Sequence, residues 1–202
     1  MGYSAPERAA ADSSGTVQAT AAELVGRRVR LRPLADSDAD PLFEAVDSSR
    51  EALKRLLSWV PKAEGAGEEA AFIRRAREEA ARSESSVWGV FESRSERLAG
   101  VASLGGLAPS ERGRGRFCVW IRADRRDRGY ATEAGRLLVG HAFRRSGLHR
   151  IFARIDPANR GARRVLRKVG FRYEGRLRDD SKINGRWVDT ECWGLLKAER
   201  KR

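Results

Sequence analysis

The chain of 202 residues, with 41% hydrophobic and 34% charged side chains, suits one globular domain and excludes a chain that is disordered throughout. No apolar run approaches the roughly 20 residues of a membrane-spanning helix, so we expect no contact with a membrane. The formal net charge of +13 is uneven, because residues 111–202 hold 26 basic and 11 acidic residues while residues 1–110 hold 15 and 17. A basic half favours a polyanionic partner, either a nucleic acid or a phosphorylated cofactor, although solvated arginines explain it as well.

The N-terminal segment differs in composition from the rest of the chain. Residues 1–23 are rich in Ala, Ser, Gly and Thr and have no apolar period, which predicts a flexible tail before one folded domain at 24–202. No basic stretch followed by an apolar one marks a secretory signal, so we expect a cytoplasmic protein. Cys118 and Cys192 fall in expected strands without a metal-ligand spacing, so we expect no metal site and two reduced core cysteines, with one of them lining an active-site groove as the alternative.

One strand and three helices are expected in the first half of the chain. Residues 28–32 alternate polar and apolar side chains, which predicts a half-buried strand. Ser37, with Asp40 and Pro41 after it, is typical of a helix start. Apolar residues three and four positions apart predict two further helices, one carrying Leu53, Leu56 and Leu57 up to Pro61 and one from Glu68 to about Arg82.

Strands and helices are interleaved in the second half. An expected hairpin of strands and a third strand come first, at 87–92, 98–107 and 116–122. A helix ending before Gly147, a strand at 149–155 and a helix from Asn159 to Gly170 follow, and two strands close the chain at 171–177 and 187–196 around Asn184-Gly185. This order predicts an α/β fold with a mixed, mostly antiparallel central sheet flanked by helices.

The junction between the third of these strands and the next helix carries the most chemical information. Residues 122–132 lead from strand to helix through Gly129 and the small Ala131. The free N–H groups of a helix's first turn bind anions, and a glycine lets a phosphate approach the backbone closely. A pyrophosphate would fit here, although an ordinary turn explains the loop equally well when it is taken alone. Three arginines add positive charge, namely Arg125, Arg126 and Arg128.

The pattern Arg126-x-x-Gly129-x-Ala131 resembles the pyrophosphate-binding motif of the GNAT superfamily of N-acetyltransferases, Gln/Arg-x-x-Gly-x-Gly/Ala. The family's next motif is an asparagine after the following strand and then a helix that ends in Gly-Phe, which Asn159 and Gly170-Phe171 match. The opening residues 30–34 and the closing residues 184–196 resemble the branch of ribosomal-protein N-terminal (alanine/serine) acetyltransferases. The resemblance covers residues 26–198, and four loose motifs in the right order make it specific.

The resemblance implies a GNAT-type fold and acetyl-CoA as the acetyl-donor cosubstrate. Backbone groups of Val119, Trp120 and Ile121 would bind the pantetheine arm of the cofactor as an added strand does. Asn159 would hold the pantetheine through its side-chain amide, a role compatible with capping its helix. The pyrophosphate would lie against the loop residues Arg126, Asp127, Arg128, Gly129, Tyr130, Ala131 and Thr132.

The acid–base residues usual in the family are absent from their positions. Arg116 stands where many relatives have a glutamate, Leu166 where others have a tyrosine, and Ala162 where the favoured branch often has a serine. Three substitutes near the closing hairpin, each with a structural role as the alternative, are Asp189, Glu191 and Tyr173. An enzyme without a strong base suits α-amines, because their pKa near 8 leaves a fraction neutral at pH 7, whereas lysine amines have a pKa of about 10.4.

The acceptor is expected to be a primary amine. Residues 36–69 border the expected acceptor groove and hold nine acidic against four basic residues, which favours a cationic acceptor unless they form an ordinary helical face of mixed charge. We rank first the N-terminal α-amine of a protein such as a ribosomal protein, with the ribosome as a further candidate partner. The alternatives are a small-molecule amine (a polyamine, aminoglycoside or other antibiotic) and a module that binds acetyl-CoA or nucleic acid without catalysis. The sequence leaves monomer and homodimer open.

Overall fold

The computed structural model describes residues 23–54, 65–107, 113–145, 147–183 and 185–200. The predicted tail at 1–23 therefore lies almost wholly outside the described residues. Within these ranges, strands occupy eight segments: β1 (Leu24–Val25), β2 (Val29–Pro33), β3 (Ser85–Glu92), β4 (Leu98–Gly105), β5 (Arg114–Ile121), β6 (Arg150–Ile155), β7 (Arg172–Ile183) and β8 (Arg186–Leu196). The helices are α1 (Ala39–Asp47), α2 (Arg50–Leu53), α3 (Ala66–Ala81), α4 (Tyr130–Arg145) and α5 (Arg160–Val169).

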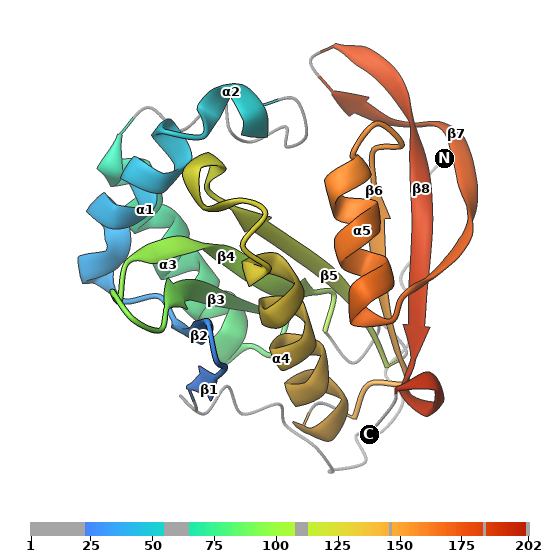
Figure 1. Cartoon of the computed structure of the whole chain (residues 1–202), viewed down its shortest axis with the longest axis horizontal. Coiled ribbons are helices and arrows are strands. Elements are labelled where there is room, and N and C mark those ends of the chain that lie inside the picture. Colours follow the sequence, from blue (N-terminus) through green and yellow to red (C-terminus); the bar gives the residue numbers. More distant parts are fainter. Residues whose placement is uncertain (1–22, 55–64, 108–112, 146, 184, 201–202) are drawn as a thin grey trace, which may run out of the picture.

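All strands in the described ranges join one sheet in the order β1-β2-β3-β4-β5-β6-β8-β7. Every neighbouring pair is antiparallel except β5 with β6, which is parallel (Figure 1). The predicted α/β fold with a mixed, mostly antiparallel sheet and flanking helices is confirmed. The second predicted helix is described only as far as Leu53, because residues 55–64 lie outside the described part of the chain.

Two hydrophobic clusters lie on opposite faces of the sheet. Neighbouring residues of β4 point to opposite faces, so Val101 packs in a cluster with α1 and α3 while Ala102 packs in a cluster with α4 and α5. Figure 1 shows α3 behind the sheet and α4 and α5 in front of it. None of the helices in these ranges combines the length and the apolar character that a membrane crossing needs.

The centre of the sheet opens between β5 and β6. These strands pair only where residues 114–116 of β5 meet residues 150–152 of β6, and the C-terminal half of β5 has no described pairing on that side. The N–H of Arg122 donates to the carbonyl of Ala99 in β4 at 2.8 Å. Because backbone groups alternate in direction along a strand, those of Trp120 also face β4, whereas those of Val119 and Ile121 face the opening.

Helix α5 begins and ends where the sequence predicts. The side chain of Asn159 accepts from the N–H of Ala162 at 2.9 Å, and Gly170 ends the helix with φ of 115°. On the predicted apolar face, only Leu166 is fully buried, because α5 covers the outer part of the sheet and the other members stay half-exposed.

The prediction of two core cysteines is wrong for Cys118. Its side chain is exposed, on the face of β5 that also carries Arg116, whereas Cys192 is half-buried. An alternating strand buries one face, and in β5 that face holds Phe117 and Ile121. Cys118 therefore lies on the other face of β5.

Candidate functional site

The loop between β5 and α4 forms a corner at which backbone N–H groups are left without acceptors in the described ranges. Gly129 has φ of 81°, in the left-handed region, and α4 begins at the next residue. The first helical hydrogen bond runs from the N–H of Glu133 to the carbonyl of Gly129 at 3.0 Å. The N–H groups of Tyr130, Ala131 and Thr132 have no acceptor within the described part of the chain, so they remain available to an anion.

Contacts with the α1–α2 turn hold the first half of this loop in place. Ser49, which is 2% exposed, accepts a hydrogen bond from the N–H of Ala123 at 2.8 Å. Arg122 reaches the carboxylate of Glu44 on α1 at 3.1 Å. The start of the loop is thus tied to helices on the opposite face of the sheet.

Glu92, at the end of β3, holds the second half of the loop. Its carboxylate accepts from the Tyr130 hydroxyl at 3.1 Å and pairs with Arg125 at 2.9 Å. Burial alone would raise the pKa of Glu92, but hydrogen bonds from Ser95 and Tyr130 and the charge of Arg125 outweigh burial and lower that pKa. Glu92 therefore stays ionised and fixes the loop on both sides of Gly129.

The loop residues predicted to contact a pyrophosphate lie together at this corner. Arg126 and Arg128 are exposed and have no hydrogen-bond or ion-pair partner among the described residues. Asp127 has φ of 58° and a side chain that is 90% exposed, with Arg164 of α5 at 3.9 Å. The loop segment that precedes the free N–H groups therefore carries two exposed arginines without a partner in the described ranges.

The other predicted cofactor contacts, on β5 and at the end of β6, lie at the opening between these two strands, except for Trp120. The backbone groups of Val119 and Ile121 point into it, while those of Trp120 pair with Val101 of β4. Asn159 follows the end of β6, where its side-chain oxygen caps α5 and its amide nitrogen has no acceptor in the described ranges. The side-chain amide of Asn159 can therefore donate to a bound molecule while the helix keeps its cap.

The three predicted substitutes for the missing acid–base residues lie on the outer strands β7 and β8. Tyr173 is 52% exposed and packs edge-on against Trp193, with ring centres 5.5 Å apart. Tyr173 belongs to β7, which is the third strand from β5 in the sheet, so about 14 Å separate the two strands. Asp189 accepts from the N–H of Asp179 at 3.2 Å. The positions that lack the usual side chains hold exposed Arg116, half-buried Ala162 and buried Leu166.

Glu191 is a buried ion-pair partner of α5. Two nitrogens of Arg163 donate to its carboxylate at 2.9 and 2.6 Å, and Arg176 lies 3.5 Å away. Burial of this carboxyl would raise its pKa, but the hydrogen bonds from Arg163 and Trp193 outweigh burial, so the pKa of Glu191 is lowered. A carboxylate with a lowered pKa is a weaker base than an ordinary glutamate.

This lowered pKa makes the stability of the protein depend on pH. Because the folded pKa of Glu191 lies below the unfolded value of about 4.3, its contribution is complete above that value and is lost as pH falls through the folded pKa. We expect Glu191→Gln to lower the free energy of unfolding at pH 7 by about 3 kcal/mol, since Arg163 loses its charged partner. Thermal unfolding between pH 7 and 3 measures this, and the variant should lose less stability than the wild type between pH 5 and 3. Parallel curves for the two proteins would contradict this assignment.

One further residue at the corner, Arg28, was not predicted from the sequence. The N–H of Arg28 donates to Glu133 of α4 at 2.9 Å, and its guanidinium lies 2.8 Å from the position that a Cβ on Gly129 would take. Arg28 precedes the loop by about one hundred residues in the chain. Only the tertiary structure brings this arginine to the site.

The comparison with known families decides the identity of this fold. The model described as "Acetyltransferase (GNAT) domain" matches residues 28–172, most of the chain, including the loop and both strands at the opening. The chain belongs to the GNAT family. The predicted recognition of this family is thereby confirmed.

Individual relatives of this GNAT chain are similar over shorter stretches. "Probable N-acetyltransferase YjcK" of Bacillus subtilis (strain 168) is 36% identical over 112 residues, which is 55% of this chain and 62% of the relative. Spermidine N(1)-acetyltransferase of Escherichia coli (strain K12) is 31% identical over 74 residues, which is 37% of this chain and 40% of the relative. The chain thus spans less than two thirds of the length of these curated relatives.

A solved structure confirms the fold over nearly the full length. The GNAT chain superimposes with a TM-score of 0.81 on RimL, a ribosomal L7/L12 alpha-N-protein acetyltransferase in complex with coenzyme A, over 87% of this chain and 98% of that one. The sequence identity is 19%, so the likeness concerns the fold.

Proposed function

We propose that this chain transfers the acetyl group of acetyl-CoA to a primary amine. The observation that carries the proposal is the position of the free N–H groups of Tyr130, Ala131 and Thr132, at the end of the strand that parts from its neighbour. Backbone donors and arginines suit a pyrophosphate, and Gly129 leaves a cradle that a side chain would fill. Membership of the GNAT family supports this chemistry.

The residues of the chain would bind and orient the reactants. Acetyl-CoA would supply the thioester carbonyl for attack by a neutral amine, so that the C–N bond forms, the C–S bond breaks, and coenzyme A leaves as a thiol after the amine gives up one proton. The outward backbone groups of Val119 and Ile121 would hold the pantetheine arm by β-strand pairing. An N–H on this edge would stabilise the negative charge that develops on the thioester oxygen, an effect of about 3 kcal/mol per donor in other enzymes. The amide nitrogen of Asn159 would donate to the same arm from the β6 side.

An N-terminal α-amine of a protein is the acceptor that fits this site best. The side chains at the three usual acid–base positions cannot accept a proton, and Glu191 is held in ion pairs. An amine that is already partly neutral at pH 7 avoids the need for a strong base. The same fold occurs in RimL, which is named as a ribosomal L7/L12 alpha-N-protein acetyltransferase. This similarity supports a ribosomal protein in the cytoplasm as the protein whose N-terminus is acetylated.

A small cationic amine is the second candidate acceptor. The similarity to a spermidine acetyltransferase favours it. The acidic excess of residues 36–69 supports it less than the sequence suggests, because Asp38 and Glu69 are buried. Four of the exposed carboxylates pair with nearby cations, namely Asp36 with Arg77, Glu44 with Arg122, Asp47 with Arg50 and Glu51 with Lys54.

Mass spectrometry distinguishes these acceptors. The protein is incubated at pH 7 with acetyl-CoA and one of three substrates: a peptide with a free N-terminus and no lysine, a peptide with a blocked N-terminus and one lysine, or spermidine. We expect the free N-terminus to gain one acetyl group at least about tenfold faster than the lysine side chain, with the ratio shrinking toward pH 9 as lysine loses its proton. If spermidine alone is acetylated, the acceptor is a small cationic amine and not a protein N-terminus. If none of the three substrates is acetylated, the proposed activity is contradicted.

A further inference from the structure

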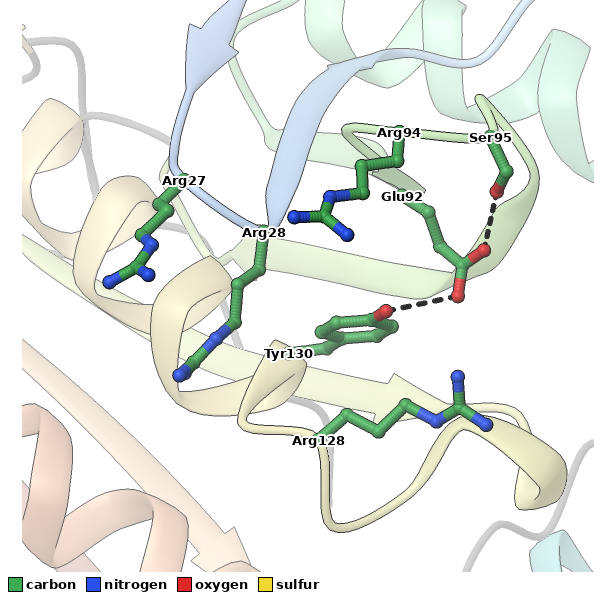
Figure 2. Close-up of a pocket in the computed structure, with 7 residues that line it drawn as sticks. All are labelled: Arg27, Arg28, Glu92, Arg94, Ser95, Arg128 and Tyr130. Atoms are coloured by element: carbon green, nitrogen blue, oxygen red, sulfur yellow. Dashed lines mark hydrogen bonds between the residues drawn. The ribbon is translucent and has the colours of Figure 1, made fainter.

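A pocket of about 490 Å³ lies next to the loop that leads into α4, between the β1–β2 turn and the β3–β4 turn. Figure 2 shows that its lining comes from three segments far apart in the sequence. We call it the arginine pocket, because its cationic members are Arg27, Arg28, Arg94 and Arg128.

The negative charge in the arginine pocket is already neutralised. Glu92 is the carboxylate that lines it, and the Tyr130 hydroxyl and Ser95 both donate to this group (Figure 2). The charge of Glu92 is balanced mainly by Arg125, which lies outside the lining, at 2.9 Å, and the charge of Arg128 also contributes to lowering the pKa of Glu92. Within the described ranges, none of the four pocket guanidinium groups makes a hydrogen bond or an ion pair.

Unpaired arginines gathered round one hollow repel one another unless an anion lies between them. Elsewhere in the described chain many arginines are paired, as Arg122 is with Glu44 and Arg163 with Glu191. A planar guanidinium donates two parallel hydrogen bonds to phosphate oxygens. The four arginines of the pocket therefore suit a terminal phosphate group as their ligand.

The arginine pocket also adjoins the corner that the proposed function assigns to the cofactor pyrophosphate. Arg128 and Tyr130 belong to both, and Gly129 between them has the Arg28 guanidinium beside it. We propose that the arginine pocket is a second phosphate subsite, which binds a terminal phosphate group beside the pyrophosphate. This inference rests on the proposed function for its neighbour, because coenzyme A carries a 3′-phosphate monoester on the ribose next to its pyrophosphate.

The test compares the dissociation constants of coenzyme A and 3′-dephospho-coenzyme A by isothermal titration calorimetry. We expect the wild type to bind coenzyme A at least about tenfold more tightly. The double variant Arg27→Gln/Arg94→Gln should reduce that ratio to about twofold or less, with an unchanged affinity for the dephosphorylated form. The matched control Arg74→Gln/Arg97→Gln removes two exposed arginines outside the pocket lining and should keep the wild-type ratio.

If both forms bind the wild type equally, inorganic phosphate is titrated into protein saturated with 3′-dephospho-coenzyme A. Phosphate binding that disappears in Arg27→Gln/Arg94→Gln supports the subsite and assigns its phosphate to a separate molecule. The inference is overturned if phosphate does not bind, or if the control pair lowers the ratio as much as the pocket pair does. Failure of both coenzyme A forms to bind would instead refute the proposed function together with the subsite.

Discussion

Replacement of Gly129 by valine is expected to weaken the binding of acetyl-CoA at least 100-fold, which corresponds to about 2.7 kcal/mol. Residue 129 has φ of 81°, a conformation that a β-branched side chain avoids. The new side chain would also meet the Arg28 guanidinium at 2.8 Å. Arg28 can turn away, but relief of the backbone strain changes φ and redirects the N–H groups of Tyr130 and Ala131 away from the pyrophosphate.

The variant Gly185→Val provides a matched control for this experiment. Gly185 lies in the β7–β8 turn with the same φ of 81°, and no atom lies within 4 Å of its Cβ position. Both variants should lose similar thermal stability, since both force valine into the left-handed region. Calorimetric titration with acetyl-CoA should show weakened binding in Gly129→Val alone. An affinity within threefold of the wild type would refute the role of the loop as a pyrophosphate site.

The second large effect is expected at Gly100 in β4. The register between β3 and β4 shifts here, since Gly100 pairs with Val90 but Leu98 pairs with Phe91, which leaves Ala99 as an extra residue. A Cβ on Gly100 would lie 2.1 Å from the backbone carbonyl of Trp120. Backbone atoms cannot rotate away as a side chain can, so β4 and β5 must separate.

We expect Gly100→Ala to lower the free energy of unfolding by about 3 kcal/mol, at the upper end of the usual cost of overpacking. Gly105→Ala, in the same strand, has no atom within 4 Å of the new Cβ and should change stability by less than about 1 kcal/mol. Urea unfolding of the two variants measures both values. Equal stability of the two variants would show that the close approach to Trp120 carries no energetic cost.

The order of the elements was readable from local sequence because each signal depends on near neighbours. Alternation predicted β2, and the cap Asn159 with the stop Gly170 gave both ends of α5. Strand β1 was not predicted, because its two residues are too few to show a period. The outer strand β7 continues to Ile183, six residues beyond its predicted end, through a register shift between Leu177 and Ser181 that has no local apolar pattern.

The candidate site was predicted where its residues share a short segment or belong to a family motif. The loop from Arg126 to Thr132 shares one segment, so its spacing is visible in the sequence. The contacts that hold it, from Ser49, Glu92 and Arg28, come from three other segments, and their pairing depends on how the sheet brings those segments together. The exposure of Cys118 was missed for a related reason, because a strand pattern does not reveal which of its faces a helix covers.

The two edge strands of the sheet affect the tendency of the protein to aggregate. An outermost strand with unsatisfied backbone groups invites another chain to extend the sheet, and long, flat, apolar borders do so most readily. Here β1 is two residues long, while β7 is twisted by two register shifts and carries charges along its length, among them Arg172, Glu174, Arg178, Asp180 and Lys182. Both borders therefore discourage aggregation through strand addition.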